Sequence, residues 1–338
     1  KYTQDADYVV MEATYGDRYH EKHPDYVYEL SKIIQETLDR GGNLVIPSFA
    51  VGRTQELLYY IRQIKEEKLV TGHGNFPVYV DSPMAIEATT IFNKNVAECF
   101  DEEAMGLIMQ GINPLTFEGL KLSVTSEESK EINFDKQPKV IISASGMCEA
   151  GRIRHHLKHN LWKPTSTILF VGYQAINTLG RALIEGTKEV KLFGETIQVS
   201  AKILRLEGMS GHADKAGLIK WITSFEQKPK VVFVVHGEDT VCDIFAETLE
   251  KEYGLCAYAP YSGAEYDLIA GRWIREGERI PVPKAEKAGK KAPSGVYARL
   301  LAAGQRLMTV IKHNEGGANK DLAKFADQIH ALCDKWDR

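Results

Sequence analysis

The 338-residue chain lacks the features of membrane-spanning and disulfide-rich proteins. No apolar run approaches the ~20 residues that a bilayer-spanning helix needs, so we expect no membrane partner. The five cysteines are odd in number and scattered, and none forms a C-x-x-C pair. Such cysteines are typical of free thiols in a reducing cytosol, which predicts a cytoplasmic protein. The first residues also lack the hydrophobic core of a signal peptide.

The chain also has no large excess of positive or negative charge. The net charge of -4 does not indicate a nucleic-acid-binding protein, although a basic groove can exist on an acidic chain. Neither a G-x-G-x-x-G sequence nor a P-loop occurs, which disfavours a nucleotide-binding transferase. The charged fraction of 26% and the hydrophobic fraction of 43% are ordinary for a globular protein, and the length predicts two domains.

Two polar clusters stand out, each beside an apolar run. Residues 208–214 read G-M-S-G-H-A-D, and H-G-E at 236–238 follows the β-branched run 231–235. That run predicts a buried strand, and a helical pattern lies between the clusters. A strand–helix–strand unit should bring His212 and His236 together at the carboxyl edge of a sheet, where open α/β sheets bind ligands. A metal site and a purely structural role both fit these histidines.

The order of these clusters resembles that of a known family. Ser-Gly-His-Ala-Asp at 210–214 and Val-His-Gly-Glu at 235–238 resemble motifs B and C of the β-CASP nucleases, which are metallo-β-lactamase-fold enzymes that process RNA or DNA. Their motif A, an acidic residue at a strand end, is similar to Glu12 in Glu-Ala-Thr-Tyr-Gly at 12–16. The resemblance covers about residues 7–283.

The resemblance implies roles for individual residues. His236 would be a zinc ligand, and His212 would be the general acid or a phosphate contact near the leaving group. Glu12 would hold His212 in orientation, and Asp214 would belong to the same catalytic group. Two zinc ions in the complete enzyme would activate the attacking water and bind phosphoryl oxygens.

The match departs from the family in one respect. The family's other zinc ligands, mainly an H-x-H-x-D-H motif, a further histidine and an aspartate, precede motif A. This chain starts at Lys1, eleven residues before Glu12, and contains none of them. We therefore expect the chain to correspond to the back half of such an enzyme. It should need an N-terminal metallo-β-lactamase segment as a partner and should be inactive and poor in zinc by itself.

A strand, a turn of small residues and a helix follow one another four times along the chain. The predicted strands are 44–46, 78–80, 140–142 and 168–171. Strands alternating with helices predict a doubly wound parallel sheet joined by right-handed crossovers, and the resemblance implies that this is the β-CASP insert. Residues 97–130 should form a less regular helical excursion within it.

The turn at 143–147, Ser-Ala-Ser-Gly-Met, is the most informative of the four. Its small residues allow close backbone approach, and a helix directly after it would offer free N–H groups to an anion. We predict a phosphate cradle for RNA, with an ordinary tight turn as the alternative. The residues predicted to contact RNA are Ser143, Ser145, Gly146, Met147, Arg152, Arg53, Arg181, Ser210 and Gly211.

The pattern changes to period two after Gly186. Residues 189–192 and 197–206 predict an antiparallel hairpin, where we place the return to the metallo-β-lactamase domain. Two amphipathic helices end the chain; they dock on the body, form a homodimer contact or bind another partner. The predicted divisions are 1–20 and 188–283 for the two parts of the metallo-β-lactamase αββα sandwich, 21–187 for the β-CASP domain, 284–295 for a lysine-rich linker and 296–338 for the helical tail.

The motifs together predict a zinc-dependent hydrolase that cleaves phosphodiester bonds of single-stranded RNA, as an endonuclease or a 5′-exonuclease. A non-catalytic scaffold subunit of an RNA-processing complex is one alternative, but the presence of Glu12, His212 and His236 argues against it. A small-molecule hydrolase of the same fold is another, and the large inserted domain argues against that.

Overall fold

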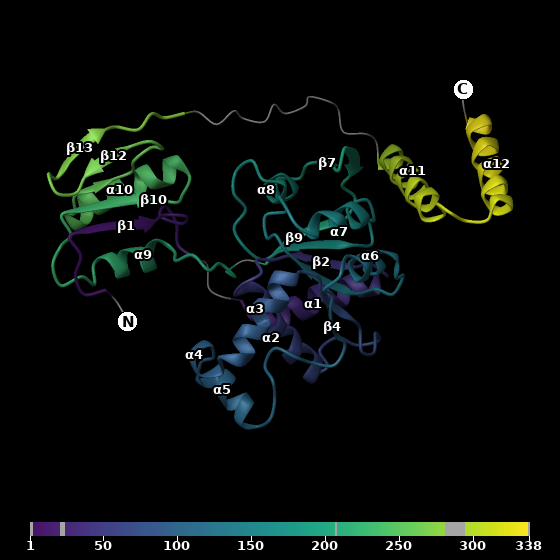
Figure 1. The fold of residues 1–338 in the computed structure, drawn as a ribbon, viewed down its shortest axis with the longest axis horizontal. Coiled ribbons are helices and arrows are strands. Elements are labelled where there is room, and N and C mark those ends of the chain that lie inside the picture. Colours follow the sequence, from purple (N-terminus) through teal and green to yellow (C-terminus); the bar gives the residue numbers. More distant parts are fainter. Residues whose placement is uncertain (1–2, 21–23, 207, 281–294, 337–338) are drawn as a thin grey trace.

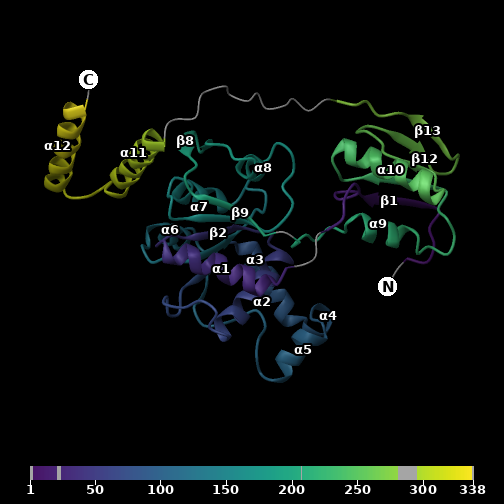
Figure 2. The ribbon, with the colours of Figure 1, turned by 180° about the vertical axis from the view of Figure 1, so that it is seen from behind.

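The computed structural model describes residues 3–20, 24–206, 208–280 and 295–336. Within these ranges the elements from α1 to β9 form a larger lobe, and β1 with the elements from α9 to β13 forms a smaller lobe (Figures 1 and 2). Two further helices make up the tail. The predicted α/β architecture with a parallel sheet is confirmed.

The larger lobe is built on a sheet of six described strands in the order β4-β3-β5-β2-β6-β9, and every neighbouring pair is parallel. Its strands are β2 (Leu44–Pro47), β3 (Val78–Val80), β4 (Leu120–Leu122), β5 (Val140–Ser143), β6 (Thr167–Phe170) and β9 (Lys202–Arg205). Its helices are α1 (Tyr26–Asp39), α2 (Arg53–Glu66), α3 (Pro83–Lys94), α4 (Val96–Cys99), α5 (Glu102–Met109), α6 (Ser126–Phe134), α7 (Ile153–Asn160) and α8 (Leu179–Ile184). An antiparallel hairpin, β7 (Glu189–Leu192) and β8 (Glu195–Gln198), lies beside them.

Both faces of this sheet are buried under helices. Alternate residues of β2 point to opposite faces, so Leu44 joins one apolar core with Leu57 of α2, and Val45 joins a second core with Leu157 of α7. All four side chains are fully buried. A parallel sheet covered on both faces is the predicted doubly wound arrangement, and the four predicted strand–turn–helix units are all present.

The smaller lobe is formed by two segments of the chain, one before and one after the larger lobe. Strand β1 (Tyr8–Glu12) pairs in parallel with β10 (Val231–Val235), which pairs with β11 (Ala257–Tyr258). Helices α9 (Lys215–Ile222) and α10 (Asp239–Tyr253) cover one face with an apolar core that includes Phe245. Aromatic rings of the hairpin β12 (Glu265–Asp267) and β13 (Arg272–Arg275) lie 5.1–5.9 Å from Phe233.

Two strand predictions need correction. Residues 202–205 are the edge strand β9, parallel to β6, and not the second half of an antiparallel hairpin over 197–206. The backbone N–H groups of Ser200 and Ala201 donate to the carbonyl of Leu161, which ends the hairpin after Gln198. The larger sheet therefore extends past residue 188, where we predicted the return to the smaller lobe. The excursion at 97–130 also contains the strand β4, whose three residues give too short a pattern to predict.

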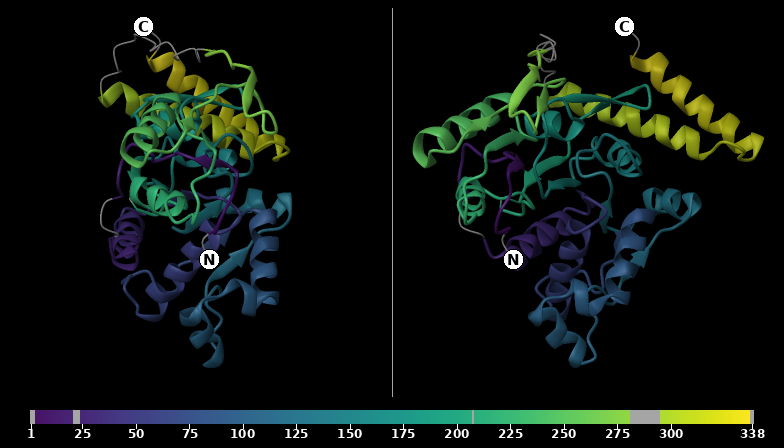
Figure 3. Two further views of the ribbon diagram at one scale, coloured as in Figure 1. Left: turned by 90° about the vertical axis from the view of Figure 1, so that its left-hand side faces the viewer. Right: turned by 60° about the vertical axis from the view of Figure 1, so that its left-hand side comes forward.

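The tail consists of α11 (Gly295–His313) and α12 (Asn319–Trp336), as the amphipathic pattern predicted (Figure 3). Most of the predicted linker, 284–294, lies outside the described residues. No helix in the described ranges is long and apolar enough to cross a bilayer.

A buried charge network ties the larger sheet to its helices. Asp81 follows β3, and none of its side chain is exposed. One carboxylate oxygen accepts a hydrogen bond from Arg152 at 2.7 Å, and the other accepts one from Ser129 and lies 2.6 Å from Nε2 of His156. His156 is also fully buried, and its Nδ1 lies 3.0 Å from Oδ1 of Asn133. Asp81 therefore connects β3, α6, α7 and the residue that precedes α7.

Replacement of Asp81 by asparagine should destabilise the protein strongly at neutral pH. Burial opposes ionisation of Asp81, but hydrogen bonds from His156 and Ser129 lower its pKa from 3.8 to about 2. Removing a partner from a buried ion pair costs roughly 3–5 kcal/mol, because it leaves the other charge uncompensated. We expect Asp81→Asn to lower the free energy of unfolding at pH 7 by that amount, measured by urea denaturation.

The loss should depend on pH. A carboxylate with a depressed pKa adds stability that is complete above its unfolded pKa and disappears as the pH falls through the folded one. The difference between Asp81→Asn and the parent should therefore shrink between pH 4 and pH 2. Glu87→Gln, at an exposed position of α3, serves as the control and should change little. An equal loss at pH 7 and pH 3 would contradict the role of the Asp81 charge.

Candidate functional site

The register between β1 and β10 places Glu12 beside the end of β10. The two strands run in parallel with Glu12 opposite Val235, so Glu12 lies next to the residue that follows, His236. The backbone N–H of Ala13 and the hydroxyl of Thr14 donate to the carbonyl of His236 at 3.4 and 3.2 Å. Residues more than 220 positions apart are thus joined at one sheet edge, as predicted.

The chain turns sharply at this edge. His236 has a φ of 51°, a left-handed conformation that costs a residue with a side chain roughly 1–2 kcal/mol. Gly237 follows it, and a Cβ there would lie 3.0 Å from the carbonyl oxygen of Ala13 and 2.9 Å from the sulfur of Cys242. The turn therefore needs glycine at 237, and strain of this kind is concentrated at functional sites.

His212 reaches the same edge from the loop before α9. Its ring centroid lies 5.5 Å from that of His236, and its Nδ1 lies 3.1 Å from Oε2 of Glu12. A carboxylate can only accept, so the pair is satisfied when Nδ1 carries the proton. Burial opposes the ionisation of Glu12, yet hydrogen bonds from Thr14 and the charge of His212 lower the pKa of its carboxyl. Glu12 is then an anion at neutral pH, and Nε2 of His212 is left for chemistry.

Asp214 fixes the loop that carries His212. Its Oδ1 accepts from the N–H of Gly217, which caps α9, and its Oδ2 accepts from the N–H of His20 at 3.0 Å. Burial opposes ionisation, but these two hydrogen bonds lower the pKa of Asp214. Both carboxylate oxygens are thus used in building the loop, and direct participation of Asp214 in catalysis stays a prediction.

Ser210 and Gly211 precede His212 in this loop. The hydroxyl oxygen of Ser210 accepts a hydrogen bond from the backbone N–H of His212 at 3.2 Å. Nothing lies within 4 Å of a Cβ added at Gly211, so the space beside it is open. The open space is compatible with the predicted RNA contact, which no contact in the structure tests.

The two lobes meet at the candidate site. The hydroxyl of Tyr173, in the turn after β6, donates to Oε1 of Glu238 at 2.8 Å, and Nη1 of Arg181 lies 3.6 Å from the same oxygen. The rings of Tyr15 and Tyr173 lie 5.8 Å apart in an edge-to-face arrangement. Burial, with the hydrogen bond to Glu238, raises the pKa of Tyr173 to about 12, so its hydroxyl remains a donor. The sequence predicted the turns after β6 and β10, which carry Tyr173 and Glu238, but Tyr173 was not predicted as a site residue.

The predicted phosphate cradle differs from the observed turn. Helix α7 begins at Ile153 and not directly after Met147, so no helix N-terminus opens onto residues 143–147. Ser143 is only 1% exposed, and its hydroxyl donates to the carbonyl of Asp81. The hydroxyl and N–H of Ser145 both donate to the carbonyl of Ala150. Donors that looked free in the sequence are therefore engaged within the protein.

The rest of this turn packs against its neighbours. Gly146 is buried beside Phe49, whose ring would lie 3.0 Å from an added Cβ. The carbonyl of Gly146 accepts a hydrogen bond from Gln174, and the carbonyl of Met147 accepts one from the N–H of Gly180. These contacts interlock the turns that follow β2, β5 and β6 at one edge of the sheet. RNA contacts of Gly146 and Met147 stay a prediction.

The three arginines predicted to contact RNA all have acidic partners in the structure. The pairs are Arg152 with Asp81 at 2.7 Å, Arg53 with Glu56, and Arg181 with Glu185 at 2.7 Å. Arg152 also donates to the carbonyls of Ser123 and Val124, so it builds the larger lobe rather than offering a free charge. Of the three, Arg181 is the most exposed and stands at the contact between the lobes.

Comparison with known proteins adds to this geometry. Residues 54–183 match the Beta-Casp domain, and residues 196–260 match the domain described as the Zn-dependent metallo-hydrolase RNA specificity domain. The chain belongs to the β-CASP family of metallo-β-lactamase-fold proteins. The resemblance inferred from the three motifs is thereby confirmed.

Individual relatives share this β-CASP region. Ribonuclease TTHA0252 of Thermus thermophilus is 37% identical over 279 residues, which cover 82% of this chain and 58% of the relative. Transcription termination factor FttA is 35% identical in Methanocaldococcus jannaschii and 32% identical in Pyrococcus abyssi, each over 259 residues. Those alignments cover 75% of this chain and 40% and 39% of the two relatives. The chain thus spans about half the length of these proteins or less.

The family description names zinc, and the described residues do not form a zinc site by themselves. No group of three or more His, Cys, Asp or Glu side chains suited to a metal ion occurs among them. His212 and His236 come closest, but Nδ1 of His212 faces Glu12. A tetrahedral zinc needs three or four protein ligands, so further ligands would have to come from outside the described part of the chain.

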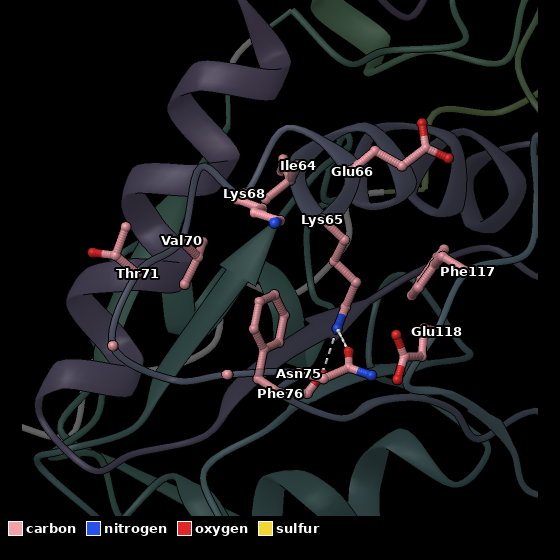
Figure 4. Close-up of a pocket in the computed structure, with 12 residues that line it drawn as sticks. Ile64, Lys65, Glu66, Lys68, Val70, Thr71, Asn75, Phe76, Phe117 and Glu118 are labelled. Atoms are coloured by element: carbon pink, nitrogen blue, oxygen red, sulfur yellow. Dashed lines mark hydrogen bonds between the residues drawn. The ribbon is translucent and has the colours of Figure 1, made fainter.

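A pocket of about 640 Å³ lies in the larger lobe, near the amino ends of strands β3 and β4 (Figure 4). Its lining residues Phe76 and Glu118 precede β3 and β4, whereas the histidine site lies beyond strand carboxyl ends. Lys65 of α2 donates to Oδ1 of Asn75 and the carbonyl of Phe76, both at 2.7 Å. Burial lowers the pKa of Lys65 to about 8. The pocket is therefore separate from the candidate site.

Zinc analysis of the 338-residue chain tests this reading of the metal ligands. We expect weak zinc binding, because the resemblance assigns His236 alone of these residues to the metal. Equilibrium dialysis against zinc with a competing chelator would measure the stoichiometry and affinity. His236→Ala should then change little, since no complete site is lost. Two tightly held zinc ions per chain would show that the ligand set has been misjudged.

Proposed function

We propose that this chain supplies the proton-transfer pair and the substrate-binding lobe of an enzyme that cleaves RNA phosphodiester bonds. The observation that carries the proposal is the pair of Glu12 and His212, 3.1 Å apart, beside His236 at the sheet edge of the smaller lobe. Tyr173 of the larger lobe contacts this edge through Glu238. The match to an RNA specificity domain and the ribonuclease among the relatives support RNA as the substrate.

The pair is suited to protonate a leaving oxygen. When a phosphodiester bond breaks, the departing oxygen gains negative charge and needs a proton. Glu12 holds the Nδ1 proton of His212, so Nε2 is free to carry a second proton to that oxygen. The loop anchored by Asp214 and Ser210 keeps the ring in place. The family description names a zinc-dependent hydrolase, and zinc would activate the attacking water. The described residues contain no group of three or more side chains that could hold such an ion.

The β-CASP lobe forms the other wall of the proposed site. Tyr173 and Arg181 reach Glu238 of the smaller lobe, so a strand of RNA lying on the histidines would also lie against the turns after β5 and β6. Tyrosine rings provide stacking surfaces for unpaired bases, which favours a single-stranded substrate. Tyr15 and Tyr173 are the rings at this position.

A non-catalytic scaffold is the second candidate. The lack of a metal-binding cluster in the described residues favours it. The short contact between Glu12 and His212 argues for catalysis, because a scaffold has no need of an oriented imidazole. Both functions predict RNA binding, and they differ in whether cleavage depends on His212.

Alanine substitutions at His212 and His236 should distinguish the roles of these two residues. The experiment uses the longest natural form of the protein that contains this chain. His212→Ala should lower turnover by roughly 10²–10⁴-fold, because a positioned acid contributes about that much. A substrate whose leaving group needs no proton, such as a nitrophenyl phosphodiester, should largely restore its rate. His236→Ala should stay inactive on both substrates and lose zinc, because it removes a ligand.

His155→Ala is the matched control, since His155 is exposed on α7 and stacks on Phe193. It should retain the activity and zinc content of the parent. Equal failure of both site variants on the nitrophenyl substrate would show that the roles are wrongly assigned. Unchanged RNA cleavage by His212→Ala would instead favour the scaffold, or an enzyme that uses another acid.

RNA binding by this chain should weaken as salt rises, because phosphate contacts release counterions. Arg181→Ala should reduce the slope of log affinity against log salt by about one, as expected for one lost phosphate contact. Fluorescence anisotropy with a labelled single-stranded RNA would measure both. Arg275→Ala, on the β12–β13 hairpin, is the control and should leave the slope unchanged. Affinity that does not vary with salt would exclude a phosphate-based contact.

A further inference from the structure

The tail helix α11 docks on the larger lobe through its polar side. Ala302, Gln305 and Lys312 lie on one helical face at spacings of three and seven residues. Ala302 is 8% exposed, Gln305 accepts from the N–H of Gln198 at 3.3 Å, and Lys312 pairs with Glu195 at 2.7 Å. Docking on the body, one of the three predicted roles of the tail, is therefore observed for α11.

The opposite side of α11 is apolar and faces away from the body. It carries Val296, Leu300, Met308 and Ile311, which are 77%, 65%, 54% and 38% exposed. A surface helix normally packs its apolar stripe inward and its polar side outward. The reversed orientation of α11 leaves an apolar surface that the described residues do not cover.

Helix α12 continues this surface with a more regular pattern. Leu322, Phe325, Ile329, Leu332 and Trp336 recur at intervals of three, four, three and four residues. This is the spacing of the apolar seam of a coiled coil, which is completed by another helix. Leu332 is 55% and Trp336 is 66% exposed, and α12 lies farther from the larger lobe than α11 does (Figures 1 and 2).

The charges beside the seam indicate which helix completes it. Asp321 and Lys335 lie on the same flank of the seam, one at each end of α12. Two copies of α12 in antiparallel orientation would place each Asp321 near Lys335 of the other copy. In the parallel orientation each Asp321 would face Ala326 of the other copy, so its charge would gain no opposite partner.

We propose that α12 pairs in antiparallel orientation with α12 of a second copy of this chain. Leu322 then packs opposite Leu332 of the other copy, and Phe325 packs opposite Ile329. Two heptads form only a short coiled coil, and the exposed apolar side of α11 enlarges the buried area toward the ~1,200 Å² of a stable interface. This inference does not depend on the proposed RNA cleavage.

Charge reversal at the two ends of α12 tests both the partner and its orientation. Sedimentation equilibrium of the full 338-residue chain should show a monomer–dimer equilibrium. Asp321→Lys and Lys335→Asp should each weaken dimerisation about tenfold, because two attractive contacts become repulsive. The double variant should restore the parent affinity, since the charges again oppose each other. Asp327→Lys makes the same charge change on the polar face of α12 and should have little effect.

Leu332→Glu should abolish the dimer, because it places a charge in the seam. Circular dichroism should show unchanged helicity for the charge-reversal variants, which lie outside the apolar core. A parent chain that remains monomeric at about 0.1 mM would overturn the proposal. So would a double variant no better than the single ones, which would show that the two copies do not associate through antiparallel α12 helices.

Discussion

The parallel pairing of β1 with β10 is the constraint on which the candidate site depends. It sets Glu12 opposite Val235, and the left-handed turn at His236 follows at once. β1 precedes the larger lobe in sequence and β10 follows it. The site therefore forms only when these two strands pair across the whole length of the intervening lobe. A shift of one residue in this register would turn Glu12 to the other face of the sheet and separate it from His212.

The larger lobe depends on a different interaction, the buried carboxylate of Asp81. Its contacts with Arg152 and His156 fix the chain that follows β5 and thus the shape of the turns at the carboxyl edge of the sheet. The same contacts engage the side chains of Arg152 and Ser143 within the protein, and their contacts with RNA stay a prediction. Positive charge at this edge is largely neutralised within the protein, so RNA affinity should rest on few phosphate contacts and on base stacking.

Sequence periodicity predicted most elements because both sheets are parallel and buried. Runs such as 44–46 and 231–235 are continuous and apolar, and each is followed by a helix. The meeting of Glu12 and His236 followed from motif order, because parallel strands bring their carboxyl ends together. His212 reaches them from the loop before α9, and the strand that precedes this loop, β9, belongs to the larger sheet. Their assignment to catalysis, as opposed to their position, stays a prediction.

Sequence analysis gave wrong predictions where contacts between distant residues determine the structure. A period-two pattern does not tell which strand a segment pairs with, so β9 was assigned to the hairpin although it pairs with β6. Likewise, the sequence predicted a helix directly after residues 143–147, whereas α7 begins at Ile153. Local sequence also cannot show that the carbonyl of Asp81, which follows β3, accepts from Ser143. The pairing of Arg152 with Asp81 has the same cause, because these two residues are far apart in sequence. The pairs Arg53 with Glu56 and Arg181 with Glu185 are three and four residues apart on one helix, a spacing that the sequence does show.

Under the proposed function, the proton-transfer pair and the substrate-binding turns belong to different lobes. The oriented pair of Glu12 and His212 lies wholly in the smaller lobe, while the turns that would hold a long substrate belong to the larger one. Tyr173 joins the two by a hydrogen bond to Glu238, which is adjacent to the His236 turn. Since the pKa of Tyr173 is raised to about 12, this bond persists over the neutral range and keeps the turn of one lobe against the other. If RNA binds between the lobes as proposed, it would have to fit beside this contact or break it, and Tyr173 would then link binding in the larger lobe to the position of His236.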